Sequence, residues 1–76
     1  MIIADKTRTN LLREWERIGI HKVEDGYTVV ALVNGRQFPV VLYMSTNEGD
    51  CEDIVREIAN AIEAGVKLFV VPANEA

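Results

Sequence analysis

The stretch YTVVALVNGRQFPVVLY, residues 27–43, is apolar at almost every position, whether odd-numbered or even-numbered residues are counted. The dipeptide NG lies in its middle and DG lies just before it. Both are typical of two-residue hairpin turns, whose central residues need a positive φ that Gly adopts freely. The pattern therefore predicts a three-stranded antiparallel meander of IHKVE, YTVVALV and RQFPVVLYM, with turns at Asp25-Gly26 and Asn34-Gly35.

The register of this hairpin follows from the Asn34-Gly35 turn. A two-residue turn there places Val29 opposite Val40 on one face of the sheet, and Ala31 and Tyr27 share that face. The other face then carries Thr28, Val30, Leu32, Gln37, Pro39, Val41 and Tyr43. Proline has no N–H to donate to a ladder, which favours an edge position for the third strand. Both faces are apolar, so both need cover.

A first helix is predicted before the meander. In TRTNLLREWERIG the apolar residues Leu11, Leu12, Trp15 and Ile18 have the spacing of one helical face. We expect a helix from about Arg8 to Ile18, capped at its start by the side chain of Thr7 or Thr9 and ended by Gly19. On this interpretation Trp15 packs against the sheet.

A second helix is predicted after the meander, in STNEGDCEDIVREIANAIEAG. Its apolar face is formed by residues in helical register: Cys51, Ile54, Val55, Ile58, Ala61 and Ile62. Asp50 and Asp53 have the spacing of a capping arrangement, and Gly65 suits the position just past the helix end. VKLFVVP then predicts a fourth strand, which is stopped by Pro72 and docks beside the first strand.

The predicted fold is therefore a single α+β domain over residues 1–76, with a frayed tail at 73–76. Its element order is α-β-β-β-α-β, with a single-layer antiparallel sheet and two helices. A chain of 76 residues buries only about 60% of the surface that its unfolded form exposes, so its own core is small.

The charge is unevenly distributed along the chain. Residues 1–38 hold six Lys/Arg and five Asp/Glu, whereas residues 39–76 hold two and seven, which makes the second half acidic by five charges. Acidic proteins repel the phosphate backbone, so we expect no direct nucleic-acid partner. No apolar run approaches the roughly 20 residues that span a bilayer, so no membrane association is expected.

The single cysteine, Cys51, cannot form an internal disulfide, and a cytoplasmic protein is expected. Its helical phase predicts a small buried hydrophobic residue. The single histidine, His21, rules out a pair of imidazoles in one chain. No phosphate loop, nucleophile motif or metal-binding spacing is present, so we expect no enzyme activity, no metal and no cofactor, and no small-molecule ligand is indicated.

An acidic patch is predicted in NEGDCED, where Glu48, Asp50, Glu52 and Asp53 crowd the start of the second helix. Its spacing is not that of a calcium loop. Acidic residues at a helix N-terminus are favoured by the helix dipole, so a structural role is the simpler interpretation.

The sequence favours a non-enzymatic protein–protein interaction module, either homodimeric or docking on a partner protein through the second sheet face. The predicted interface residues are Thr28, Val30, Leu32, Val41 and Tyr43. A monomer with one helix on each sheet face would explain the same pattern. A small acidic inhibitor or regulator of a nucleic-acid-handling enzyme, of the phage or mobile-element type, is the alternative function, because its acidic half could imitate phosphate.

Overall fold

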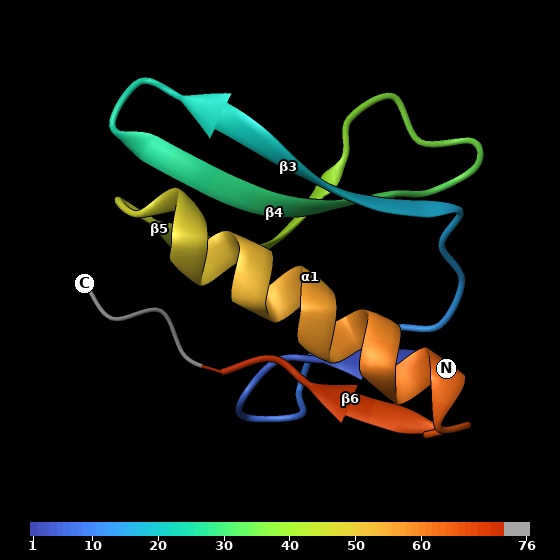
Figure 1. Ribbon diagram of the computed structural model, residues 1–76. Helices are drawn as coiled ribbons and strands as arrows, with labels where there is room; N and C mark the ends of the chain where they lie inside the picture. Colours follow the sequence, from blue (N-terminus) through green and yellow to red (C-terminus); the bar gives the residue numbers. More distant parts are fainter. Residues whose placement is uncertain (73–76) are drawn as a thin grey trace.

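The computed structural model describes residues 1–72, which form an α+β fold with one helix (Figure 1). The elements are β1 (Ile2–Ala4), β2 (Leu11–Leu12), β3 (Arg17–Val23), β4 (Gly26–Leu32), β5 (Val40–Ser45), α1 (Glu48–Glu63) and β6 (Leu68–Val70). The α+β class is confirmed, but the predicted order and the predicted two helices are wrong for the described chain. The tail predicted at 73–76 lies outside the described residues.

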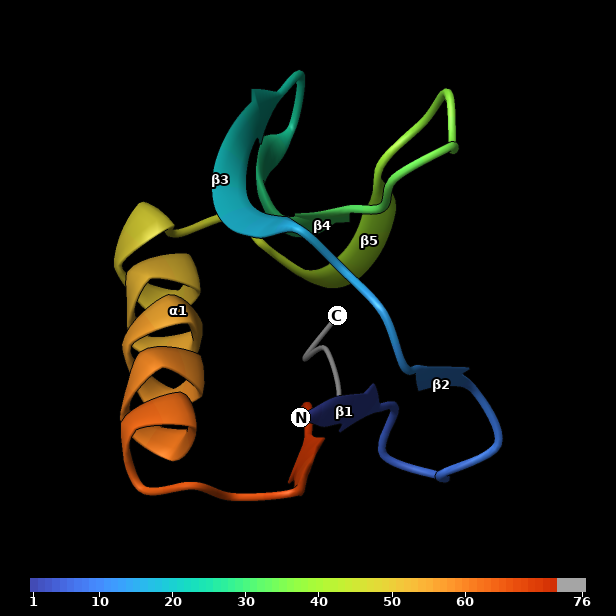
Figure 2. The same ribbon diagram turned by 90° about the vertical axis from the view of Figure 1, so that its right-hand side faces the viewer.

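The strands form two separate sheets rather than the predicted single one. β3, β4 and β5 form the expected antiparallel meander, and β2, β1 and β6 form a second sheet in which β1 pairs antiparallel with β2 and parallel with β6. Figure 2 shows the meander lying above the smaller sheet, with α1 running alongside from one to the other.

The helix predicted over residues 8–18 does not form. Thr7 and Thr9, expected to cap that helix, instead donate their hydroxyl hydrogens to the carboxylate of Asp5, at 3.1 and 3.4 Å. These bonds hold residues 5–10 in a compact turn, in which Arg8 has a φ of 59°. The chain then enters β2, and Ile18 lies in β3 opposite Ala31. The helical spacing of four apolar residues was therefore accidental.

The first hairpin turn lies one residue earlier than predicted. Val23 pairs with Gly26, so the turn residues are Glu24 and Asp25 rather than Asp25 and Gly26. Gly26 is required for a different reason: its φ is 157°, and a Cβ there would lie 2.5 Å from the carbonyl oxygen of Ser45. Gly26 thus allows β5 to approach β4 closely at the start of the strand.

The Asn34-Gly35 turn forms, but it does not set the register. The N–H of Arg36 donates to the carbonyl of Val33 at 3.1 Å, and Gly35 has a φ of 85° whereas Asn34 has no positive φ. One positive φ at the third position is typical of a type II turn, whose twist does not match that of two paired strands. The ladder consequently begins only at Val40, beyond a loop over residues 33–39.

The observed register between β4 and β5 differs from the predicted one. Val40 pairs with Ala31 instead of Val29, and a β-bulge between Val29 and Val30 shifts the pairing so that Val29 lies opposite Tyr43. A bulge inserts one residue and thereby reverses the side on which the following residues point. The predicted edge position of the proline-preceded strand is confirmed, since β5 is an edge strand.

Helix α1 and β4 form the centre of the core. The buried cluster consists of Val29, Cys51, Ile54 and Ile58, which confirms the predicted buried position of Cys51. The N-cap is Asn47 rather than Asp50, because the Asn47 side chain accepts the N–H of Gly49 at 2.9 Å. The predicted end of the helix is confirmed, with Gly65 at a φ of 74° just past it.

The final strand exists as predicted but has a different partner. β6 pairs in parallel with β1, with Phe69 opposite Ile3, and the N–H of Val71 extends the pairing by donating to the carbonyl of Ala4 at 2.9 Å. A helix of 16 residues is about 24 Å long, so α1 carries the chain away from the meander before β6 begins. β6 therefore lies beside β1 and not beside β3, where it was predicted.

Candidate functional site

The meander has one face covered by α1 and one open face. Ile20, Val29 and Tyr43 point toward α1, where they pack on the buried cluster. The register places a second set on the opposite side, hereafter the open face: Val23, Thr28, Val30, Leu32, Val41 and Met44. Leu32 is 37% exposed, Val41 54% and Met44 50%, so the open face presents apolar side chains to solvent.

Four of the five predicted interface residues share the open face. Thr28 and Val30 are buried at its centre, at 4% and 3% exposure, whereas Leu32 and Val41 are exposed. The hydroxyl of Thr28 donates to the carbonyl of His21 at 3.4 Å. Tyr43 is instead on the α1 side, because the bulge reverses its direction relative to the prediction.

Three exposed apolar residues were missed at this surface, and the first is Val23 of β3, which is 38% exposed. Met44 pairs with Thr28 and therefore lies on the open face, and Phe38 is 74% exposed on the adjacent loop over residues 33–39. If side chains alternated strictly between the two sheet faces from the Asn34-Gly35 turn onward, Met44 would lie on the face opposite to the open one. Its position on the open face could be predicted only if the β-bulge were known, and the sequence contains no distinctive signal of that bulge.

The acidic patch at the start of α1 is brought together as predicted, but it is engaged in local contacts. Asp50 accepts the hydroxyl hydrogen of Ser45 at 2.7 Å. Arg56 forms ion pairs with Glu52 at 3.3 Å and with Asp53 at 3.4 Å. Within residues 1–72 no group of three or more His, Cys, Asp or Glu side chains is placed to hold a metal ion.

Cys51 and His21 lie on opposite sides of the meander. Cys51 lies on the face of α1 that packs against the meander and is fully buried there. Burial raises the pKa of its thiol, with a further increase from the charges of Asp50 and Glu48. A buried, protonated thiol is a poor nucleophile. His21 pairs with Thr28 on the open face and is exposed. The two side chains therefore do not form a Cys-His pair.

Trp15 occupies the segment between β2 and β3 rather than a helix face. Its side chain is half-buried, and its indole N–H donates to the carbonyl of Met1 at 3.4 Å. This contact ties the segment to the start of the smaller sheet, so Trp15 has a structural role in this arrangement.

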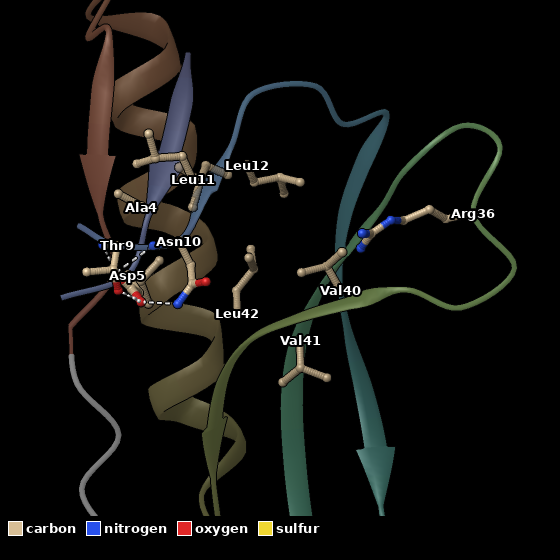
Figure 3. Close-up of a pocket in the computed structure, with 12 residues that line it drawn as sticks. Ala4, Asp5, Thr9, Asn10, Leu11, Leu12, Arg36, Val40, Val41 and Leu42 are labelled. Carbon is tan, nitrogen blue, oxygen red and sulfur yellow. Dashed lines mark hydrogen bonds between the residues drawn. The ribbon is translucent and has the colours of Figure 1, made fainter. Parts of the chain in front are cut away.

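A cavity of about 370 Å³ lies between the two sheets (Figure 3). It was not predicted as a site, although Val41, a predicted interface residue, is among the residues that line it. Its walls come from β1, β2, β5, the turn over residues 5–10, the 33–39 loop and Val71, which follows β6. The lining residues are Ile3, Ala4, Asp5, Thr9, Asn10, Leu11, Leu12, Arg36, Val40, Val41, Leu42 and Val71. Three of these lining residues, Ile3, Ala4 and Val71, are apolar and almost completely buried.

One end of the cavity is formed by a hydrogen-bonded carboxylate. Asn10 donates from its side-chain amide to Asp5 Oδ2 at 2.7 Å, and the backbone N–H of Thr9 donates to Oδ1 at 3.0 Å. These bonds stabilise the ionised form and lower the pKa of Asp5 from 3.8 to about 2, with the Asn10 side chain as the largest cause. This end is therefore anionic at neutral pH.

The other end of the cavity carries a cation. Arg36 extends from the 33–39 loop toward Val40, on the far side of the cavity from Asp5 (Figure 3). It forms no ion pair with any residue in the part of the chain that the structure describes, where every ion pair involves Arg56. The cavity is thus apolar in the middle and oppositely charged at its ends.

Comparison with known proteins identifies no relative: no family model, curated protein or solved structure matches the chain. Within residues 1–72 the helix α1 is neither long enough nor apolar enough to cross a bilayer.

Proposed function

We propose that this chain is a non-enzymatic protein–protein interaction module that forms a homodimer through the open face of the meander. The observation that supports this proposal is the grouping of Leu32, Val41 and Met44 on one face, each at least 37% exposed, with Phe38 on the adjacent loop. Contiguous exposed apolar patches usually mark interfaces, and a chain this small gains stability from burying one.

The arrangement suits a two-fold dimer. In such a dimer the same face of each copy meets the other, so the apolar centre contacts itself and the rim must be polar. Arg17 and His21 of the edge strand β3 also lie on the open face, because Arg17 pairs with Leu32 and His21 pairs with Thr28. Both side chains are exposed. These side chains provide that polar rim.

The non-enzymatic part of the proposal rests on the placement of the two most reactive side-chain types. Cys51 is buried with a raised thiol pKa, and His21 is separated from it by the sheet. Within residues 1–72 the Cys51 thiol is therefore not held within reach of the His21 imidazole.

The test is the solution mass of the wild type, a Val41→Lys variant and an Ile62→Lys control, measured by light scattering over a range of concentrations. Ile62 is 49% exposed on α1, away from the open face, so its substitution matches that of Val41 in exposure and charge. We expect dimeric wild type, dimeric Ile62→Lys, and monomeric but folded Val41→Lys. A wild type that remains monomeric at high concentration would contradict the proposal.

A second candidate function is an acidic inhibitor or regulator of a nucleic-acid-handling enzyme. It is supported by the exposed acidic side chains along α1, which include Glu48, Asp50, Asp53, Glu57 and Glu63, against the single base Arg56 in that helix. Binding to a basic enzyme surface would weaken strongly with added salt, because exposed charges are screened. Salt-insensitive binding would exclude this function.

A further inference from the structure

The cavity between the two sheets is a different surface from the open face of the meander, and of the open-face residues only Val41 also lines the cavity. Its apolar wall includes Leu12 of β2 and Val40 and Leu42 of β5, which point toward one another in Figure 3, and Val41 lines the cavity as well. A volume of about 370 Å³ is within the range of small-molecule pockets, which are mainly apolar with a few polar groups that orient the ligand.

The Arg36 end provides recognition of an anion. The guanidinium extends over the cavity and is not neutralised by an ion pair within residues 1–72. Its planar group of N–H donors matches the two oxygens of a carboxylate, which it can bind through two parallel hydrogen bonds. A carboxylate at this end would therefore be bound with its apolar part directed along Val40 and Leu42.

The opposite end provides recognition of a hydrogen-bond donor. The side-chain amide of Asn10 is oriented by its N–H bond to Asp5, and its carbonyl oxygen is thereby directed toward the cavity (Figure 3). The oxygens of Asp5 already accept bonds from Thr7, Thr9 and Asn10, so Asp5 contributes its negative charge rather than a vacant acceptor. An ammonium group is favoured there both by the carbonyl oxygen and by the charge.

We propose that this cavity binds a small amphipathic zwitterion, with a carboxylate on Arg36, an apolar body against Leu12, Val40 and Leu42, and an ammonium group near Asn10 and Asp5. Each charged end of the ligand would thus meet the opposite charge of the cavity. Since both ends and the middle contribute, a molecule with only one charged end gains less than one with both.

The proposal is tested by calorimetric titration with a homologous series of ω-amino carboxylates, including ω-aminooctanoate, and with octanoate and octylamine as single-charge probes. NMR shifts of the Leu12, Val40 and Leu42 methyl groups locate the bound molecule. We expect one ω-amino carboxylate to bind at least about tenfold more tightly than octanoate or octylamine of matched length, and to shift those methyl signals.

Variants make the test specific. Arg36→Gln should weaken binding of the zwitterion by about tenfold or more, whereas Arg13→Gln and Leu32→Lys should bind as the wild type does, because neither residue lines the cavity. Circular dichroism verifies that each variant is folded. Absence of binding by the whole series, equal affinity for octanoate and ω-aminooctanoate, or unchanged binding by Arg36→Gln would each overturn the proposal.

Discussion

Gly26 occupies a position where any side chain would meet the backbone of the neighbouring strand. Its φ of 157° is rarely adopted by other residues, and the carbonyl oxygen of Ser45 occupies the place of a Cβ. The backbone conformation and the lack of room for a Cβ therefore both require glycine at this position, where the start of β4 lies against the end of β5. Gly19, in contrast, has no atom within 4 Å of an added Cβ.

Replacing Gly26 with Ala should lower the free energy of unfolding by about 2 kcal/mol or more, because the strand must shift and the backbone is strained. Gly19→Ala should change it by less than about 1 kcal/mol, in the stabilising direction, since alanine restricts the unfolded chain. Urea denaturation of both variants measures the difference. Equal stability of the two variants would show that the close approach to Ser45 is unimportant.

The carboxylate of Asp5 illustrates how a single residue orders a turn and acquires an altered acidity. Its pKa of about 2 is below the ordinary 3.8, so the hydrogen bonds to it contribute stability above pH 3.8. That contribution is lost as the pH falls from 3.8 toward 2, because the carboxylate becomes protonated.

Asn10→Ala removes the largest cause of the lowered pKa, so the pKa of Asp5 should rise toward 3.8. An NMR titration of the Asp5 carboxyl carbon measures it directly. Thr7→Val removes a smaller contribution and should raise the pKa by less. The stability of Asn10→Ala should consequently depend less on pH between 2 and 3.8 than that of the wild type; an unchanged Asp5 pKa would contradict this explanation.

At the scale of elements, the apolar spacing of helix α1 predicts the buried residues Cys51, Ile54 and Ile58 but is wrong for Ile62 near the helix end. Ile58 is 2% exposed and Ile62, one turn later, is 49% exposed, because the helix extends beyond the meander. Ile58→Ala should lower the free energy of unfolding by about 3 kcal/mol, and Ile62→Ala by less than about 1 kcal/mol. Thermal and urea unfolding would test this, and similar losses for both would contradict the described core.

The sequence was sufficient to predict α1, the order of the meander strands and the burial of Cys51, because long periodic patterns and turn dipeptides act locally. It failed for residues 8–18, where four apolar positions had helical spacing but Asp5 held Thr7 and Thr9, and Ile18 gained a partner in Ala31. Tertiary pairing outweighed a weak local preference there.

The sites were less predictable than the fold because they depend on register. The bulge beside Val30 moved Tyr43 away from the open face and placed Met44 on it. The cavity was not predicted, since it joins residues of β1 and β2 to residues of β5 and the 33–39 loop that are far apart in the chain. No local pattern identifies such a juxtaposition.

At the scale of the whole molecule, the two sheets differ in how well they are held. β4 is paired on both sides, and Val29, Val30 and Ala31 are at most 3% exposed, whereas β2 is a two-residue edge strand. Local opening should therefore be rarer at β4 than at β2.

Hydrogen exchange followed by NMR should find the slowest amides in β4 and the fastest strand amides in β2, with protection differing by about 10-fold or more. The larger sheet would then be identified as the stable unit of the fold. Protection of Leu12 equal to that of Ala31 would contradict this view and would show that both sheets open together.

The parallel pairing of β1 with β6 has a consequence for the protein as it is synthesised. Ile3 is synthesised before its partner Phe69, which follows only after the meander and α1 have been made. At roughly 5–20 residues per second, this leaves β1 without its central pairing for several seconds. During that interval the nascent chain exposes Ile3 and Ala4, which are buried in the finished fold, so β1 is open to association with other chains until β6 is made.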